Sequence, residues 1–377
     1  MSPASRPVPD FAALSAPQVH PLKAYDPGYE PTEVKRDLKL AQLVEAGSNE
    51  NALGCSPQVH AAVRAVPLEV LHRYPDAGGR LLKRALAARY GRDPSEFTLG
   101  NGSHELLVLI AETFGGPGTD IVYSQYGFAV YPLAAQACGS NSIAVPATAG
   151  LNADADAMLA AVTPRTRLVY LANPNNPTGT HWDRATLCRV LTALPGHVLF
   201  VLDEAYFEFG DPEVLPDGMA LLDAYPNLIV ARTFSKGYGL AGLRAGYCAS
   251  HPQFAQVLER TRLSFNLNQL ALRAAAAALA DQDFVTATRA WLKPERERLA
   301  ASLTMLGLKV YPSQGNFLLV DFGRDAAPIE QALVPRGVLL RPMRGYGLPN
   351  HLRITVCREV ENDVLVAALR DVLKELP

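Results

Sequence analysis

An α/β fold with a mostly parallel sheet flanked by helices is predicted for this chain by three observations. Short apolar runs occur at 167–172, 198–202 and 228–231, a pattern typical of strands buried on both faces, although periodicity alone leaves buried helix open. A polar cluster follows each run, where open α/β sheets bind their ligands. From about residue 97 to 250 such runs alternate with helical segments, as βαβ units require.

The chain divides in order into four predicted parts. Residues 1–35 are rich in proline and predict an extended arm, which is stable only when it lies on another surface. The large domain is predicted at residues 36–250, and within it the segment 36–60 could instead pack with the small domain. Residues 251–282 continue it as helices, and 283–377 predict a smaller α+β domain.

The elements of the second half are expected from their apolar periodicity. Pro294 lacks an amide hydrogen and is expected to kink or split the helix that contains it. Helices are predicted at 253–265, 267–280, 284–306 and from Glu361 onward, and strands near 316–320, 338–340 and 352–356.

Composition excludes several classes of function. The 377 residues are 49% hydrophobic with a net charge of -2, and no basic cluster is interleaved with aromatic residues as nucleic-acid binding needs. The five cysteines form no CxxC pair and have no neighbouring histidines at ligand spacing, so we expect reduced thiols and no metal. No apolar segment is long enough for a signal peptide or a membrane span. These features predict a cytoplasmic protein with small-molecule substrates.

The most informative segment surrounds Lys236. Hydroxyl residues Thr233 and Ser235 precede the lysine, and Arg244 follows eight residues after it. A lysine can hold an aldehyde as a Schiff base, while hydroxyls and a guanidinium grip a phosphate beside it. Pyridoxal phosphate is the cofactor that fits. A lone lysine near a loop is usually just solvated, so this prediction depends on the other motifs.

A glycine-rich turn supplies the second piece. Gly102, Ser103 and His104 precede an apolar helix at 106–114, so their backbone amides lie at the positive end of its dipole and suit a phosphate. An ordinary capped helix with Ser103 at the N-cap is the alternative explanation.

Asp203 supplies the third piece, because a carboxylate at the end of a buried strand needs a partner. A protonated pyridine nitrogen is such a partner, whereas Glu204 faces the other way in an extended chain. Tyr206 and Asn176 can hydrogen-bond the phenolic oxygen of the ring, and Phe128 can stack on it. Taken alone, these last residues also suit a core or a turn.

Eight short motifs in this order resemble the histidinol-phosphate aminotransferase family, within the fold-type I enzymes that use pyridoxal phosphate. The resemblance extends from Tyr25 to Arg353. The motifs are SNEN at 48–51, RYPD at 73–76, GSHE at 102–105, NNPTG at 175–179, DEAY at 203–206, SK at 235–236, AGLR at 241–244 and LRIT at 352–355.

The resemblance implies further roles. Lys236 is implied as both nucleophile and general acid/base, and Tyr74 of the partner subunit as a ligand of the cofactor phosphate, which requires a homodimer. Arg353 is implied to bind the carboxylate of glutamate or 2-oxoglutarate and, with Arg341, the phosphate of the other substrate. Tyr25 on the arm is implied to contact the substrate.

Four positions depart from the family pattern or are ambiguous within it. Ala52 and Cys55 replace common prolines, and His104 stands where aspartate or asparagine is usual. Arg344 is either a third substrate contact or solvated.

Transamination between L-histidinol phosphate and 2-oxoglutarate, giving imidazole acetol phosphate and glutamate in histidine biosynthesis, is the function implied. Two alternative functions stay open: an aromatic amino-acid aminotransferase, and a decarboxylase of an amino-acid phosphate on the same scaffold. A cofactor-sensing regulator would need a DNA-binding domain, and only the arm precedes the region of resemblance.

Overall fold

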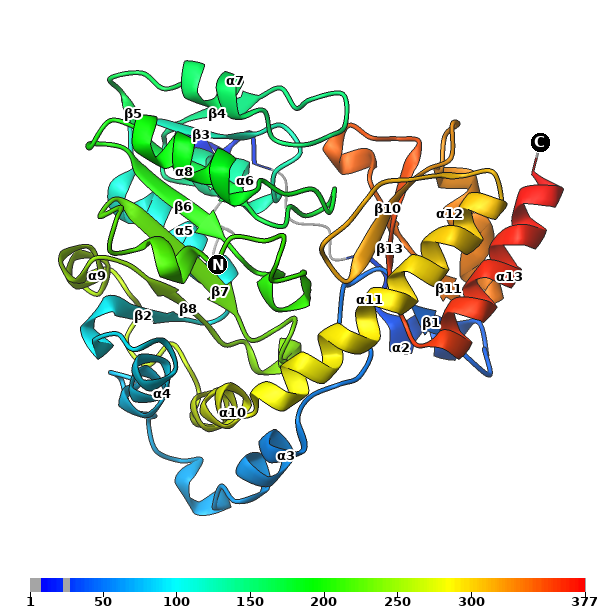
Figure 1. Cartoon of the computed structure of the whole chain (residues 1–377), viewed down its shortest axis with the longest axis horizontal. Coiled ribbons are helices and arrows are strands. Elements are labelled where there is room, and N and C mark those ends of the chain that lie inside the picture. The colour runs from blue at the N-terminus through cyan, green and yellow to red at the C-terminus, as the bar shows by residue number, and fades with distance from the viewer. Residues whose placement is uncertain (1–7, 23–27, 377) are drawn as a thin grey trace, which may run out of the picture.

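A seven-stranded sheet forms the larger part of the molecule in the computed structural model, which describes residues 8–22 and 28–376 (Figure 1). Strands β3 to β7 run parallel to one another, while β8 is antiparallel to both β7 and β2. The strand order is β2 (Phe97–Gly100), β8 (Gly246–Ala249), β7 (Leu228–Thr233), β6 (Leu199–Asp203), β5 (Thr166–Ala172), β3 (Asp120–Ser124), β4 (Asn141–Val145).

Helices cover both faces of this sheet because its side chains alternate between two cores. Val201 and Ile229 join the core under α5 (Ser103–Phe114), α6 (Val130–Ala137) and α9 (Pro252–Leu258). Phe200 and Val230 join the core on the other face. That face is covered by α4 (Arg80–Tyr90), α7 (Ala155–Ala160), α8 (Arg184–Ala193) and α10 (Gln269–Ala280).

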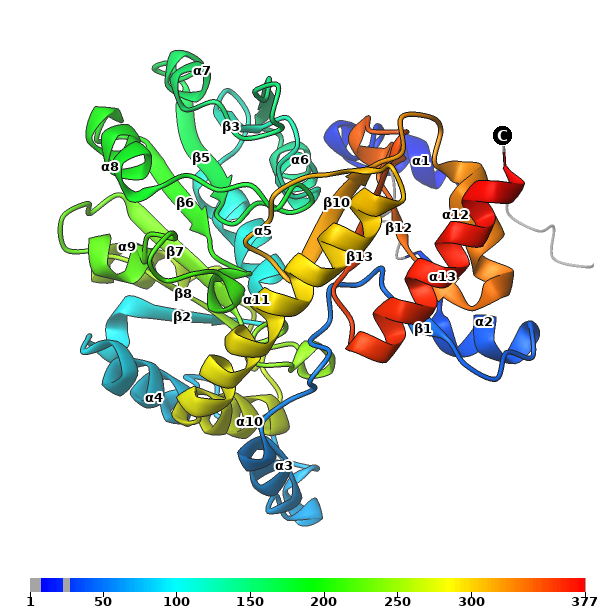
Figure 2. The same ribbon diagram turned by 45° about the vertical axis from the view of Figure 1, so that its right-hand side comes forward.

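A four-stranded antiparallel sheet forms the smaller part, with its helices beside it (Figure 2). Its order is β12 (Arg341–Pro342), β13 (His351–Thr355), β10 (Phe317–Asp321), β9 (Lys309–Val310), and its helices are α11 (Gln282–Met305), α12 (Ala327–Leu333) and α13 (Glu359–Glu375).

The segment 36–60 is shared between the two parts. β1 (Val44–Glu45) pairs in parallel with β11 (Val338–Leu339), and Val44 lies in the core of the smaller part. Helix α3 (Pro57–Arg64) packs instead against α10 of the larger part. The domain boundaries stay a prediction, since α11 contributes Val285 to one core and Leu292 to the other.

The expectation that Pro294 splits its helix is wrong, because α11 runs unbroken through it. Proline removes one hydrogen bond, to the carbonyl four residues earlier. That residue, Ala290, is exposed, so water can solvate its carbonyl. Leu292 and Leu299 are buried on the packed face and hold the helix together across the missing bond.

Two other expectations need correction. The arm is not simply extended, because α1 (Phe11–Leu14) and α2 (Pro31–Asp37) form in it, the second with Glu30 as N-cap and proline at its first position. The helix expected at 253–265 ends at Leu258, and Phe265 has a left-handed φ of 59° that no helix accommodates.

Eight 3₁₀ turns complete the described elements. They are η1 (Pro17–Val19), η2 (Leu68–Val70), η3 (Pro94–Glu96), η4 (Phe207–Phe209), η5 (Gly218–Leu221), η6 (Ala241–Leu243), η7 (Val334–Arg336) and η8 (Arg344–Tyr346). None of the described helices is both long and apolar enough to cross a membrane.

Candidate active site

The carboxyl ends of three parallel strands meet at one edge of the large sheet. In the ladder Ala172 pairs with Asp203, and Asp203 pairs with Ala231, so β5 and β6 end level with each other and β7 runs two residues further. The chain after each end carries a predicted site residue: Asn176 after β5, Asp203 as the last residue of β6, and Lys236 after β7. The register therefore brings these three motifs to one place, as parallel strands require.

Asp203 is buried without a cationic partner among the described residues. Its Oδ2 accepts a hydrogen bond of 2.9 Å from the Tyr131 hydroxyl, and its Oδ1 accepts one from the Ala205 amide. Burial raises the pKa of Asp203 to about 6, although the Tyr131 hydrogen bond lowers it. A cation placed here would be strongly favoured, because it would restore the ionised form.

Sequence reasoning assigned Tyr131 no role. The signal was its place three residues after Phe128, and the two rings meet edge to face at 6.1 Å. Tyr131 stacks on Tyr170 at 4.9 Å, and this contact holds its hydroxyl on Asp203.

Lys236 projects toward the loop that follows β1. Its Nζ donates to the Ser48 carbonyl at 2.9 Å and lies 5.8 Å from the centre of the Tyr206 ring. Burial, followed by the charge of Arg353, lowers the pKa of Lys236 to about 8. The amine is therefore far closer to its neutral, nucleophilic form at physiological pH than an exposed lysine is.

Tyr206 is held by a residue that sequence reasoning named only as part of a motif. Asn49 is fully buried and donates from Nδ2 to the Tyr206 hydroxyl at 3.0 Å. Its Oδ1 accepts from the hydroxyl of Thr355, on β13. Burial raises the pKa of Tyr206 to about 12, so the phenol stays protonated and able to donate.

Arg244, Ser235 and Gly102 form the predicted phosphate cradle. The Arg244 Nη1 donates to Ser235 Oγ at 3.2 Å, and Thr233 Oγ1 donates to the same oxygen at 3.0 Å. A Cβ on Gly102 would lie 2.5 Å from Arg244 Nη2, so only glycine lets the guanidinium reach this turn.

Helix α5 begins at the turn. Gly102, and not Ser103, is its N-cap, and it makes no side-chain cap hydrogen bond. The alternative of a Ser103 cap is therefore wrong. The first amides of α5 lack intrahelical partners and lie next to Arg244, a combination that suits an anion.

His104 and Phe128 lie together beside this cradle. Their rings meet edge to face at 6.3 Å. Burial, and then the Arg244 charge, lowers the pKa of His104. Its imidazole is therefore neutral near physiological pH and adds no charge to the cradle.

Two arginines lie on one face of the small sheet. Arg341 and Arg353 are direct partners in the antiparallel pair of β12 and β13. Arg353 is buried, and it donates from Nη1 to Asn176 Oδ1 at 2.7 Å and from Nη2 to the Gly47 carbonyl. This contact joins the face of the small sheet to the edge of the large one.

The remaining candidates lie elsewhere. Tyr74 is 82% exposed and stacks on Phe265 at 4.6 Å. Arg344 forms a surface ion pair with Asp325. Glu204 faces away from Asp203 and pairs with the buried Arg232, as alternation along the strand predicts. Tyr25 lies outside the described residues.

The residues present fit pyridoxal phosphate. They offer an amine of lowered pKa at Lys236, an anion cradle at Arg244, and at Asp203 a buried carboxyl that no described residue pairs with a cation. These three groups match the aldehyde, the pyridine nitrogen and the phosphate of that cofactor.

Comparisons with known proteins decide the family. The family model described as "Aminotransferase class I and II" matches residues 41–369. A histidinol-phosphate aminotransferase of Pseudomonas fluorescens is 49% identical over 366 residues, which cover 97% of this chain and 98% of the relative. The chain belongs to the histidinol-phosphate aminotransferase family, among the class I and II aminotransferases. The resemblance found in the sequence is thus confirmed.

Other members of the family agree in length and fold. A relative from Methylococcus capsulatus is 46% identical, covering 96% of this chain and 99% of its own. The crystal structure of histidinol-phosphate aminotransferase from Sinorhizobium meliloti in complex with pyridoxal-5'-phosphate matches with a TM-score of 0.87 and 34% identity. That match covers 96% of this chain and 98% of the other. The predicted fold class is confirmed.

Proposed function

We propose that this chain transfers an amino group between L-histidinol phosphate and 2-oxoglutarate with pyridoxal phosphate as cofactor, the step of histidine biosynthesis that yields imidazole acetol phosphate and glutamate. The proposal rests on the family to which the chain belongs and, for the donor, on one observation. That observation is the pair of arginines on β12 and β13.

Arg341 and Arg353 favour a donor that carries a phosphate. Directly paired residues of antiparallel strands project from the same face, and like charges placed there repel each other. An anion between them would remove this cost, and guanidinium groups bind phosphate oxygens in pairs. Phenylalanine and tyrosine bring only a carboxylate, for which one arginine suffices.

The chain's own residues divide the work of the reaction. Lys236 would take the proton from the α-carbon of the donor and deliver it to the carbon of the cofactor that carries the aldehyde, since its lowered pKa makes the neutral amine available. Asp203 holds the pyridine nitrogen in its protonated form, and the Arg244 cradle holds the phosphate. Pyridoxal phosphate supplies the electron sink. Tyr206 and Asn176 orient the ring by hydrogen bonds, and Phe128 covers it.

Steady-state kinetics test the donor. Purified, cofactor-loaded protein is assayed for kcat/KM with L-histidinol phosphate and with L-phenylalanine, each with 2-oxoglutarate as acceptor. A preference of about 100-fold or more, roughly 3 kcal/mol of transition-state discrimination, is expected for the phosphate donor. Parity would make the chain an aromatic aminotransferase. Release of carbon dioxide from L-threonine phosphate would make it a decarboxylase.

We further propose a cytoplasmic homodimer in which Tyr74 of the partner subunit completes each site. Exposed apolar side chains support the interface, because Leu68, Leu71 and Leu263 lie more than half exposed in the segments around the Tyr74–Phe265 stack. Patches of this kind on a folded chain mark association surfaces.

Mixed dimers test this arrangement. Lys236→Ala and Tyr74→Ala are each expected to be nearly inactive, but heterodimers made from the two contain one intact site. Unfolding and refolding an equimolar mixture should restore about a quarter of wild-type activity, since half of the dimers are mixed and half of their sites are intact. No recovery in a mixture that refolds to dimers would contradict the proposal.

A further inference from the structure

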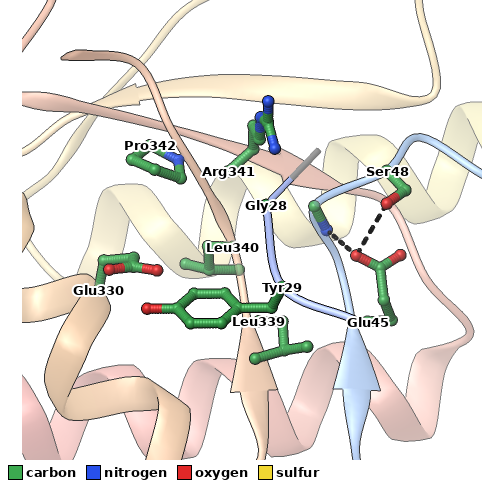
Figure 3. A pocket seen from close by; sticks show the side chains of 10 residues that line it. Gly28, Tyr29, Glu45, Ser48, Glu330, Leu339, Leu340, Arg341 and Pro342 are labelled. Atoms are coloured by element: carbon green, nitrogen blue, oxygen red, sulfur yellow. Dashed lines mark hydrogen bonds between the residues drawn. The ribbon is translucent and has the colours of Figure 1, made fainter. Parts of the chain in front are cut away.

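A cavity of about 280 Å³ lies between β1, the β11–β12 segment and α12 (Figure 3). Glu45, Gly47 and Ser48 line one side, and Glu330 lines the side formed by α12. The stretch Gly28–Tyr29 of the arm enters this cavity and places the Tyr29 ring beside Leu339. The segment that leads into α2 is thus seated next to the strand that carries Arg341.

Tyr29 is anchored by a buried carboxyl. Its hydroxyl points toward the Glu330 side chain in Figure 3 and interacts with that carboxyl. Glu330 is only 6% exposed, and its Oε1 has no hydrogen-bond partner among the described residues. Burial raises the pKa of Glu330, while the Tyr29 hydrogen bond lowers it. Losing the hydroxyl would leave a desolvated carboxyl, which makes this contact costly to break.

Gly28 lies against the guanidinium of Arg341. It has a left-handed φ of 81°, and a Cβ at this position would lie 2.5 Å from Arg341 Nη1. The backbone therefore passes the arginine at contact distance, which only glycine permits. Because Tyr29 is the next residue, its anchor decides where Gly28 lies and so limits the positions open to the Arg341 head group.

We propose that the Tyr29–Glu330 contact is a positioning element for Arg341, which holds its guanidinium ready for the phosphate of the amino donor. The inference rests on the proposed function, since it assigns Arg341 to that phosphate. A long arginine side chain loses conformational freedom when it binds, and fixing it beforehand removes part of that cost. In this role Tyr29 and Glu330 act on Arg341 through Gly28.

The test uses the two half-reactions of the cofactor-loaded enzyme, followed by cofactor absorbance. Tyr29→Phe should raise the KM for L-histidinol phosphate roughly five- to tenfold with kcat unchanged, and should leave the half-reaction with L-glutamate within twofold. Tyr29 is already 45% exposed, so losing its hydroxyl does not open a core. Tyr225→Phe, which removes a hydroxyl bonded to Thr192 in another part of the molecule, is the matched control.

Rescue separates positioning from loss of structure. Glu330→Gln keeps an oxygen that accepts from Tyr29 and should behave like wild type, whereas Glu330→Met should match Tyr29→Phe. Gly28→Ala should raise the same KM. Gly323→Ala, at a left-handed glycine with open space around it, should not. In an Arg341→Gln background, Tyr29→Phe should add nothing.

The outcomes are distinct. Equal effects of Tyr29→Phe on both half-reactions, or an undiminished effect without Arg341, would overturn the positioning role. Inhibition of the L-glutamate half-reaction by inorganic phosphate reports Arg341 without L-histidinol phosphate, and Tyr29→Phe should weaken it. If wild type prefers phenylalanine but phosphate inhibition still depends on Tyr29, the proposed function fails and the positioning role stands. If phosphate inhibits both proteins equally, the positioning role fails.

Discussion

The edge of the large sheet and the face of the small sheet build the site in different ways. Asp203 ends its strand, and Asn176 and Lys236 follow theirs within a few residues, so local sequence and strand register place them. Arg341 and Arg353 meet through strand pairing, and Arg341 also depends on Gly28, more than 300 residues away in the chain. At the cofactor end the residues at the strand ends are thus placed by local structure and register, whereas the donor end depends on long-range packing.

The largest expected effect comes from the cofactor end. Lys236→Ala should lower kcat by about 10⁴-fold or more with either donor, because both the nucleophile and the proton carrier are lost. Steady-state assays over both donors measure this. Lys293→Ala, at a lysine that pairs with Asp211 on the surface, is the control and should stay fully active.

A smaller loss is expected from Asp203→Asn. The amide cannot stabilise a cation in this buried place, and kcat should fall by about 10²- to 10³-fold, again for both donors.

Tyr131→Phe should lower kcat by about tenfold, because it removes one hydrogen bond to the Asp203 carboxyl. If either change altered only the reaction of one donor, the two ends would not be separate.

Sequence predicted the first region better than the second, and the reason is physical. The polar residues at the strand ends directly follow apolar runs in the sequence. Asp203 and Lys236 could therefore be predicted from an apolar run and the polar cluster after it. Asn49 could not be assigned its contact, since Tyr206 and Thr355 reach it from elements more than 150 residues away. Tertiary contacts of this kind leave no local pattern.

The same distinction explains the errors in secondary structure. Pro294 signals a break locally, but burial of Leu292 and Leu299 on either side outweighs one missing hydrogen bond. The helix after Pro252 ends at Leu258, and Phe265, expected in that helix, instead has a left-handed φ and stacks on Tyr74. In both places packing overrides the local preference.

The smallest expected effect is a shift in the pH at which the Lys236 amine titrates. In cofactor-free protein, burial and the Arg353 charge lower the pKa of Lys236 to about 8, so its neutral form appears as pH rises through 8. Labelling by an amine-reactive reagent, followed by mass spectrometry, should show a midpoint there for Lys236. Asp211 raises the pKa of Lys293, which should react only at higher pH in the same digest. Arg353→Gln should move the Lys236 midpoint upward, and an unmoved midpoint would contradict the coupling.

Arg341→Gln tests most directly whether the two regions are separate. Its half-reactions with L-histidinol phosphate and with L-glutamate are compared with those of wild type by stopped-flow absorbance. We expect kcat/KM for the phosphate donor to fall about 30- to 100-fold, as loss of a charged hydrogen-bonding group implies, and that for glutamate to change less than threefold. Equal losses with both donors, or no loss with the phosphate donor, would contradict the division between a cofactor end and a donor end.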